Sequence, residues 1–348
     1  MGSLMDHKFT YVAALLAAVS LPTAAEARTQ MRAVGSSTVY PFAKAVAERV
    51  ARANPRLGTP IIESTGTGGG FKLFCQGVGE RFPDVSDASR RMKASEAKQC
   101  ASTGVTKVTE IQVGIDGIAF ATARNTPMSG LTTREIYMAL AKTPFGKPNR
   151  AKTWKDINAK YPAIPIRVYG PPPTSGTRDA LGELIMTVGC ESNPSMVALK
   201  KSDENKFKAI CSAMREDGGF IEAGENDNLI VQKLEANAGT FGIFGYSYLE
   251  ENVGRLKGLQ INGVNPTYET ISSFRYPGAR PLYIYLKNAH AGAIPAVRAF
   301  AAEFTKESAF GPRGYLVKSG LIASPANVRA RSQQLARTLQ PLNFSILK

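Results

Sequence analysis

Short runs of apolar residues, many of them β-branched or aromatic, alternate along this chain with stretches that have helical spacing. The runs that predict strands are 31–34, 61–63, 113–122, 166–169, 241–244 and 281–286. Strands that alternate with helices are typical of α/β folds, in which the sheets are mainly parallel. The pattern therefore predicts an α/β protein.

Two of the intervening stretches are predicted to be amphipathic helices. The first begins after Pro41 and has apolar residues at positions i, i+4 and i+8, whereas the second has them at i, i+3, i+4 and i+7. These positions are Phe42, Val46 and Val50 in the first helix and Leu181, Leu184, Ile185 and Val188 in the second. Because such spacing places the apolar side chains on one face, we expect that face to be buried.

The start of the chain has the pattern of an export signal. His7 and Lys8 precede an apolar run at 11–21, and small residues define a cleavage site near Ala27. The run is shorter than the roughly 20 apolar residues of a membrane-spanning helix. We expect a signal peptide of residues 1–27 that is removed on export, so that the mature protein is periplasmic.

The remaining stretch of about 320 residues exceeds the size at which single cores usually split, and two domains are expected. The apolar stretches 117–122 and 282–286 are candidates for strands that cross between two lobes. We therefore predict a discontinuous first lobe, residues 28–121 plus 284–348, and a second lobe, residues 122–283.

The charge of the chain is strongly positive, with 43 Lys and Arg against 28 Asp and Glu and a formal net charge of +15. The basic residues are scattered, without a dense block or an aromatic-basic repeat, and this disfavours nucleic acid as a partner. A positive field also raises the local concentration of a small anionic ligand. The charge is thus compatible with an anion-binding protein.

Four cysteines fall as two local pairs, Cys75 with Cys100 and Cys190 with Cys211. In an exported chain, two disulfides are the expected use of such pairs, with free thiols as the alternative. No CxxC motif is present and His290 is the only histidine after the signal segment, so we expect no metal site.

Three turns rich in Gly, Ser and Thr each lie between a predicted strand and a predicted helix. They are 35–42, 63–70 and 174–179. A helix start offers unpaired N–H groups and about half a positive charge, while hydroxyl groups add donors and glycine lets the backbone approach closely. Each turn alone is a weak signal because Ser and Thr caps are common. Their recurrence predicts an oxyanion site.

The first two of these turns belong to the predicted first lobe and the third to the second lobe. In open α/β sheets, ligands bind beyond the carboxyl ends of the strands, where turns of this kind lie. We therefore expect the anion to be held at the interface between the lobes.

A fourth segment, 84–91, contains Asp87 and Arg90. A carboxylate beside an anion is repulsive unless it accepts a hydrogen bond from a protonated ligand, so Asp87 would select hydrogen phosphate over fully ionised sulfate. Arg90 would supply the compensating charge as a planar fork suited to phosphate. The alternative is a surface turn with solvated charges.

Four segments together resemble the phosphate-binding proteins of bacterial phosphate-specific ABC transporters: Gly35–Pro41, Gly66–Lys72, Ser86–Arg90 and Thr174–Asp179. Their order and spacing match over nearly the whole mature chain. The resemblance implies two Rossmann-like lobes joined by two crossing strands, the type II periplasmic-binding-protein fold. It also implies that a monomer without a cofactor buries inorganic phosphate between its lobes and delivers it to an ABC transporter membrane permease.

The resemblance also assigns residues to the phosphate. Those it implies are Ser37, Thr38, Val39, Thr67, Gly68, Asp87, Ser175, Gly176 and Thr177. Members of the family carry an arginine four residues before the Ser of the Ser-Gly-Thr turn, where this chain has Pro171. The positive charge is therefore expected from Arg90 or Arg178, and Arg90 is preferred because it shares a loop with Asp87.

Three other functions are compatible with parts of the sequence. A secreted phosphatase-like hydrolase would need a general base near one of the serines, and the chain offers only His290 and no Gly-x-Ser-x-Gly elbow, so no catalytic residues are assigned. A protein that binds sulfate, molybdate or another oxyanion would find Asp87 unfavourable. A surface or adhesive protein could reuse the same fold.

Overall fold

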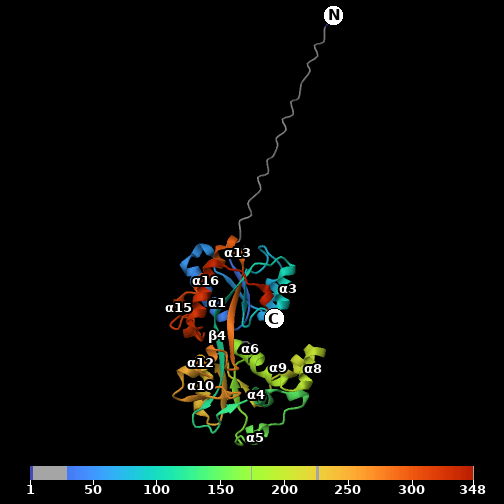
Figure 1. Cartoon of the computed structure of the whole chain (residues 1–348), viewed down its shortest axis with the longest axis vertical. Helices are drawn as coiled ribbons and strands as arrows, with labels where there is room; N and C mark the ends of the chain where they lie inside the picture. The colour runs from blue at the N-terminus through green and yellow to red at the C-terminus, as the bar shows by residue number, and fades with distance from the viewer. Residues whose placement is uncertain (3–29, 174, 225–226, 348) are drawn as a thin grey trace.

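The computed structural model describes residues 1–2, 30–173, 175–224 and 227–347. Figure 1 shows two lobes arranged along the long axis and connected by long strands that run from one lobe into the other. The expected signal peptide lies outside the described residues, apart from Met1 and Gly2. Within the described part of the chain, no helix has both the length and the hydrophobicity that crossing a membrane requires.

The first lobe, lobe I, contains the first six main elements of the chain and the last four. These are β1 Arg32–Gly35, α1 Tyr40–Ala53, β2 Ile61–Ser64, α2 Thr67–Phe74, β3 Val85–Ala88, α3 Ala94–Ser102, α13 Asn288–Ala293, α14 Pro295–Phe304, α15 Glu307–Phe310 and α16 Ala326–Thr338. The crossing strands are β4 Val108–Ala123 and β11 Ala279–Lys287.

The second lobe, lobe II, is formed by the chain between the crossing strands. Its strands are β5 Gly130–Leu131, β6 Val168–Gly170, β7 Phe220–Glu222, β8 Phe241–Gly245, β9 Leu256–Gly258 and β10 Gln260–Ile261. Its helices are α4 Thr133–Leu140, α5 Trp154–Ile157, α6 Gly176–Ala180, a π-helical segment Leu181–Met186, α7 Thr187–Glu191, α8 Pro194–Ser202, α9 Glu204–Ser212, α10 Asp227–Ala236, α11 Tyr246–Glu251 and α12 Tyr268–Ser272.

The strand order runs through both lobes as β2-β1-β3-β11-β4-β8-β6-β7. Pairing is parallel where β1 meets β2 and β3, and where β6 meets β7 and β8. The crossing strands are antiparallel to each other and to their neighbours β3 and β8. The predicted α/β fold with two crossing strands is confirmed.

Each lobe has its own apolar core. In lobe I, α1 packs on α14 at one face of the sheet, and the predicted buried positions Phe42, Val46 and Val50 of α1 are all buried. Figure 1 shows α3 on the other side of this sheet. Burying such side chains contributes about 1.5–3 kcal/mol each. These cores hold the strand ends, and therefore the loops that follow them, in fixed positions.

The core of lobe I ends and that of lobe II begins within the crossing strand β4. Ile111 and Val113 belong to the core of lobe I, whereas Ile115 and Ile118 belong to that of lobe II. The exact lobe boundaries at 121 and 284 stay a prediction.

The second predicted amphipathic helix differs from its expected form. Its middle, Leu181–Met186, is π-helical, and its buried residues are spaced by four and five positions. The i→i+5 hydrogen bonds of a π segment shift the residues that follow it around the helix axis. Val188 is therefore 46% exposed, and the prediction that it is buried is wrong.

Both predicted disulfides are present. Cys75 bonds to Cys100 within lobe I, and Cys190 bonds to Cys211 within lobe II. They join residues 25 and 21 positions apart in the sequence. Loops of this length stabilise a fold by about 3 kcal/mol each in the chain-entropy model. Each bridge lies within one lobe, and neither one joins the two lobes.

Candidate functional site

Three backbone segments of lobe I converge at the carboxyl ends of β1 and β3. Ser36 N donates a hydrogen bond to Asp87 O at 2.9 Å. A Cβ added at Gly35 would lie 2.0 Å from Asp87 O, and one added at Gly70 would lie 2.5 Å from the Gly35 Cα. Glycine is therefore required at both positions, because the approach of the three segments leaves no room for a side chain.

Helix α2 begins at Thr67, so the glycine-rich run 68–70 forms its first turn. The sequence had indicated a turn that precedes the helix, and this expectation is wrong. The helix N-cap, Gly66, has φ +71° and makes no side-chain cap. The N–H groups of the first turn are thus left to a ligand or to water. A Cβ at Gly68 would meet only the Arg90 Nη2, at 4.0 Å, which leaves the surface of this turn open.

The hydroxyl of Thr67 is tied to the loop after β3. It accepts a hydrogen bond from Ser89 N at 3.1 Å and shares another with Ser89 Oγ at 3.0 Å. These contacts fix the start of α2 beside the segment that carries Asp87. The sequence did not single out Ser89 as a site residue.

In the first loop, Ser36 has a role that the sequence did not indicate. Its Oγ accepts hydrogen bonds from Thr38 N at 3.2 Å and from Val39 N at 3.4 Å. These are the N–H groups of the residues that the resemblance assigns to phosphate. Since both bonds are long, an anion of higher charge density can compete with this hydroxyl for the same donors.

Asp87 and its neighbour Ser86 each have a buried side-chain oxygen without a hydrogen-bond partner among the described residues. Asp87 is 1% exposed, and its unpartnered atom is Oδ1. Burial raises the pKa of Asp87 to about 8. The side chain can therefore hold a proton at neutral pH, and it lies where the first loop and the start of α2 meet.

Arg90, the preferred arginine, is held inside lobe I. Its guanidinium forms two hydrogen bonds with the Glu96 carboxylate, at 2.7 and 2.9 Å. It also lies over the ring of Phe71 at 5.7 Å from the centroid. Its Nη2 lies 4.0 Å from the position of a Cβ added at Gly68, so the guanidinium is at the edge of the α2 N-terminus. Arg90 as a phosphate ligand stays a prediction.

The loop of lobe II brings Ser175, Gly176 and Thr177 to the start of α6. Ser175 caps the helix, because its Oγ accepts a hydrogen bond from Thr177 N at 3.2 Å. Arg178, the alternative arginine, donates to Pro171 O at 2.9 Å and pairs with Glu222 at 3.3 Å. Its charge is thus directed to other groups of lobe II.

The loops of the two lobes meet directly. Thr38 Oγ1 donates to Gly176 O at 3.2 Å, and Ser37 Oγ donates to the carboxylate of Asp179. A Cβ at Gly176 would lie 2.5 Å from the Thr38 Cα, so only glycine allows this approach. The structure therefore brings the predicted residues of the first and third loops together.

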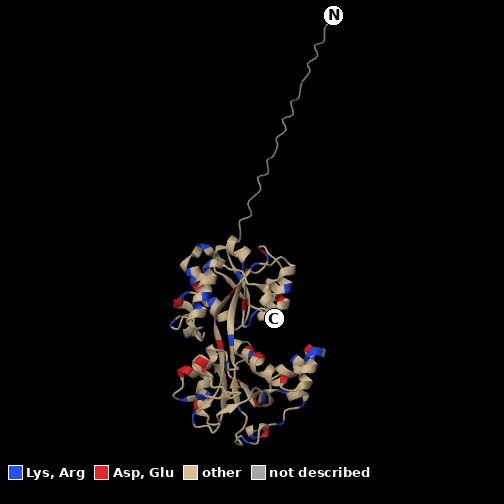
Figure 2. Ribbon diagram, viewed as in Figure 1, with Lys and Arg blue, Asp and Glu red and all other residues tan. Residues whose placement is uncertain are grey.

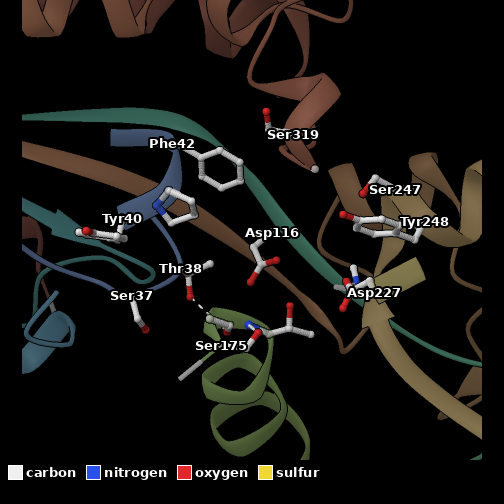
Figure 3. A pocket seen from close by; sticks show the side chains of 15 residues that line it. Ser37, Thr38, Tyr40, Phe42, Asp116, Ser175, Asp227, Ser247, Tyr248 and Ser319 are labelled. Carbon is white, nitrogen blue, oxygen red and sulfur yellow. Dashed lines mark hydrogen bonds between the residues drawn. The ribbon is translucent and has the colours of Figure 1, made fainter. Parts of the chain in front are cut away.

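A cavity of about 430 Å³ adjoins this contact, as Figure 3 shows. Its predicted site residues are Ser37, Thr38, Ser175, Gly176 and Thr177. A second cavity, of about 730 Å³, is lined by residues of both lobes that include Arg90 and Arg178. Val39, Thr67, Gly68 and Asp87 line neither cavity. The predicted residues thus form a central polar region with a cavity on either side, rather than one pocket.

Arg280, on the crossing strand β11, lies at the contact between the loops and was also missed by the sequence reasoning. It is 3% exposed, and its Nη2 donates to Thr38 Oγ1 at 2.6 Å and to Gly176 O at 3.2 Å. Its Nε donates to Asp116 on β4 at 3.0 Å. Burial raises the pKa of Asp116, and Arg280 opposes that rise. A signal was available, since β4 carries two acidic residues, Glu110 and Asp116, and β11 carries two basic residues, Arg280 and Lys287, within largely apolar segments.

Charged residues of both signs are spread over the surfaces of the two lobes (Figure 2). The large net charge is therefore not concentrated in one basic face. The charges that distinguish this protein are those buried between the lobes, where the low dielectric strengthens their interaction with an anion.

Two α/β lobes, joined by paired crossing strands around a polar cleft, place the chain in the periplasmic-binding-protein class of folds. The model of the PBP superfamily domain matches residues 22–308. The chain belongs to this superfamily and, within it, to the family of protein SphX and the phosphate-binding protein PstS.

The relatives match over most of their length. The chain is 33% identical over 323 residues to protein SphX of Synechococcus elongatus, which covers 85% of each chain. It is 31% identical over 261 residues to the phosphate-binding protein PstS of Staphylococcus saprophyticus, with 74% of this chain and 69% of the relative covered. A crystal structure described as a possible phosphate binding protein from Planctomyces limnophilus superposes with a TM-score of 0.71 at 28% identity, over 89% of this chain and 98% of that chain.

Proposed function

We propose that this protein captures inorganic phosphate between its lobes in the periplasm and delivers it, as a monomer, to the membrane permease of an ABC importer. The proposed ligands come from the segments that follow strands β1, β2 and β6 and from strand β3 itself. They are Ser37, Thr38, Val39, Thr67, Gly68, Asp87, Ser175, Gly176 and Thr177. Membership of the family that includes the phosphate-binding protein PstS supports this function.

The observation that carries the proposal is the buried Asp87 carboxyl with an unpartnered oxygen. One proton must lie between this carboxyl and a bound oxyanion, because two ionised groups in contact would repel each other. Hydrogen phosphate brings that proton with it. Sulfate does not, and it must find Asp87 already protonated. The site therefore favours phosphate, and the preference grows when the pH exceeds about 8, the raised pKa of Asp87.

The geometry gives less support to a hydrolase. His290 is 4% exposed and both of its ring nitrogens are engaged, Nδ1 with Asp84 Oδ1 at 2.7 Å and Nε2 with Gly79 N at 2.9 Å. It is thus held within lobe I and not beside a cleft serine. The relative with a functional name is a binding protein.

Calorimetric titration of protein that has been unfolded, freed of anions and refolded tests the proposal. We expect one phosphate per chain and, at pH 9, sulfate at least about 10-fold weaker, because sulfate then requires Asp87 to be protonated about one pH unit above its pKa of about 8. Molybdate is the third titrant. Equal affinities for phosphate and sulfate at pH 9 would refute the role of Asp87, and the absence of phosphate binding would refute the function.

A further inference from the structure

Arg280 is the one arginine of the described chain whose hydrogen bonds join the first loop of lobe I to the third loop in lobe II. Through Nη2 it reaches both Thr38 and Gly176, and through Nη1 it donates to Glu183 Oε2 at 2.8 Å. Its Nε is taken by Asp116. A cation at this place faces the same two loops that are proposed to hold the anion.

The two carboxylate partners of Arg280 are not equivalent. Asp116 lies on β4 directly opposite Arg280 in the strand register, and its side chain is 15% exposed. Backbone pairing of the two strands therefore keeps this contact in place. Glu183 lies in the π-helical segment of lobe II, and its side chain is 53% exposed. It can leave the guanidinium for water at little cost, because an exposed ion pair contributes only about 0–1 kcal/mol.

The other two arginines near the cleft are already committed within their own lobes. Arg90 makes a two-bond pair with Glu96 in lobe I, and Arg178 is bound by Pro171 O and Glu222 in lobe II. Among the described residues, neither one has a hydrogen bond to a group of the opposite lobe. A charge supplied by Arg280 would act on both lobes at once.

We infer that Arg280 supplies the positive charge for the bound anion, and that the anion takes the place of Glu183 on its guanidinium while Asp116 stays bound. This inference rests on the proposed function, since it names a further ligand of the same site. It also explains how the chain can have proline at position 171. The arginine comes from a crossing strand instead of from the loop of lobe II.

The exchange has a measurable consequence, because Glu183 and the anion compete for one group. Removing the charge of Glu183 should strengthen anion binding, whereas a carboxylate that merely shaped the cleft would weaken binding when changed. Glu183 is held by the single hydrogen bond from Nη1, so one oxygen of a tetrahedral oxyanion can replace the carboxylate without loss of a hydrogen bond.

The experiment measures phosphate affinity by calorimetry for the wild type, Arg280→Gln, Arg280→Lys and Glu183→Gln, each refolded free of anions. The control is Glu235→Gln, which removes a carboxylate of lobe II that pairs with Arg255 outside both cavities. We expect Arg280→Gln to bind about 100-fold more weakly and Arg280→Lys to be intermediate, since a point charge replaces a fork. Glu183→Gln should bind about 3- to 10-fold more tightly, and the control within about twofold of the wild type.

The outcomes distinguish failure of the proposed function from failure of the inference about Arg280. If the wild type does not bind phosphate, the proposed function fails and the inference fails with it. If the wild type binds and folded Arg280→Gln binds equally well, only the inference is overturned. If Arg280→Gln does not fold, the half-exposed Glu183 decides: tighter binding supports the exchange, and unchanged or weaker binding overturns it.

Discussion

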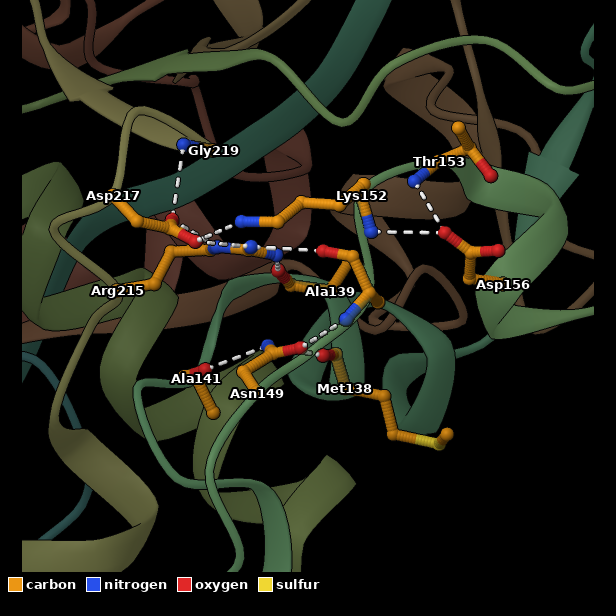
Figure 4. Close-up of polar contacts among 11 residues, drawn as sticks. Met138, Ala139, Ala141, Asn149, Lys152, Thr153, Asp156, Arg215, Asp217 and Gly219 are labelled. Atoms are coloured by element: carbon orange, nitrogen blue, oxygen red, sulfur yellow. Dashed lines mark hydrogen bonds and ion pairs between the residues drawn. The ribbon is translucent and has the colours of Figure 1, made fainter.

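Two arginines of this protein are almost equally buried, yet their surroundings differ in kind. Arg215 is 4% exposed in the interior of lobe II, where it pairs with Asp217 through Nε and Nη2, both at 2.7 Å (Figure 4). Its other donors reach the carbonyl oxygens of Ala139 at 2.9 Å and Ala151 at 2.8 Å. All of these partners belong to lobe II. Arg280, 3% exposed, has partners in both lobes.

The difference teaches that burial alone does not identify a ligand-binding arginine. A guanidinium whose partners lie in one rigid unit is part of the architecture, because no motion of the lobes changes its contacts. The carboxylates paired with these two arginines differ in the direction of their pKa shifts. Hydrogen bonds from Arg215 lower the pKa of Asp217, whereas burial raises the pKa of Asp116 despite its pairing with Arg280. Arg215 and Asp217 therefore form a stable ion pair within lobe II. In the cleft, the pairing with Arg280 does not offset the cost of burying the Asp116 carboxylate.

The largest effect that would sharpen this comparison is the loss of Arg215. We expect Arg215→Met to lower the free energy of unfolding by about 1–3 kcal/mol, because it leaves the carbonyl groups of Ala139 and Ala151 without their donor. Urea unfolding measures this change. Phosphate affinity, measured on the folded fraction, should stay within about twofold of the wild type. A stable variant with weakened binding would place Arg215 in the site and break the comparison.

Substitution of Asp87 in the cleft should mainly change anion affinity. Asp87→Asn is expected to weaken phosphate binding by about 10-fold or more, since a charge-assisted hydrogen bond of about 1.5–3 kcal/mol is lost. It should also narrow the gap between phosphate and sulfate. For the wild type, sulfate affinity should fall about tenfold per pH unit above pH 8, and the variant should lack this slope.

The matched control for this change is Asp217→Asn, the same substitution at an exposed carboxylate of lobe II that lines neither cavity. It should lower stability and leave both anion affinities unchanged. Calorimetry with phosphate and sulfate at pH 7 and pH 9 separates the two variants. Equal anion affinities for Asp87→Asn and the wild type would make Asp87 a structural residue.

A smaller expected effect concerns the pH dependence of the free energy of unfolding, to which Asp87 and Asp217 contribute with opposite signs. Asp87 has a pKa raised to about 8 in the folded chain, so the folded state keeps a proton that the unfolded chain loses above about pH 4. Without phosphate, the free energy of unfolding should therefore fall as the pH rises from about 4 to about 8. Asp217 has a lowered pKa, and its contribution is present above about pH 4 and is lost as the pH falls below it.

Urea unfolding from about pH 2 to about pH 8 checks both signs. Asp87→Asn should abolish the decline between pH 4 and pH 8, and Asp217→Asn should reduce the loss of stability on acidification. If both variants change the same part of the profile, the two carboxyls do not differ in the way the structure indicates.

The smallest expected effect is a change of shape. The proposed anion contacts lie on both lobes, so phosphate should favour the arrangement in which the lobes are closed around it. Small-angle scattering of anion-free protein should show a smaller radius of gyration after phosphate is added. Ser175→Ala with Thr177→Ala should reduce this change, and Thr153→Ala, at the start of α5, should not. Identical curves for the wild type with and without phosphate would indicate a rigid, preformed site.

The sequence predicted the fold and the loops because both depend on local patterns. Strands β1, β2, β4, β6, β8 and β11, helix α1 and the disulfides were predicted from spacing within short segments, whereas strand β3, which carries Asp87, was not predicted. The resemblance placed Thr38 and Gly176 in one site, and the structure brings them together. These features could be predicted because segments rich in glycine and hydroxyl residues at the carboxyl ends of strands recur as ligand-binding elements in α/β folds.

Other features depend on tertiary context, and the sequence could not provide them. Arg280 pairs with Asp116, 164 positions away in the sequence. This pairing forms because β11 lies beside β4 in the sheet. The glycine-rich run reads as a turn because glycine has a low helix propensity, but close packing of Gly70 on Gly35 favours the helix. The π segment retains the apolar composition of an ordinary helix, and its altered spacing becomes visible only in the packed chain.

The position of β11 has a consequence for how the chain reaches its native state. This strand lies between β3 and β4, where Tyr283 pairs with Ala88, so a sheet begun near the amino terminus is completed by a segment almost 200 residues later. Lobe II, by contrast, is built from continuous chain and has shorter loops to close. We expect lobe II to fold first, because distant pairings carry a larger entropic barrier. Until β11 arrives, β3 and β4 present open edges that invite association with other unfolded chains.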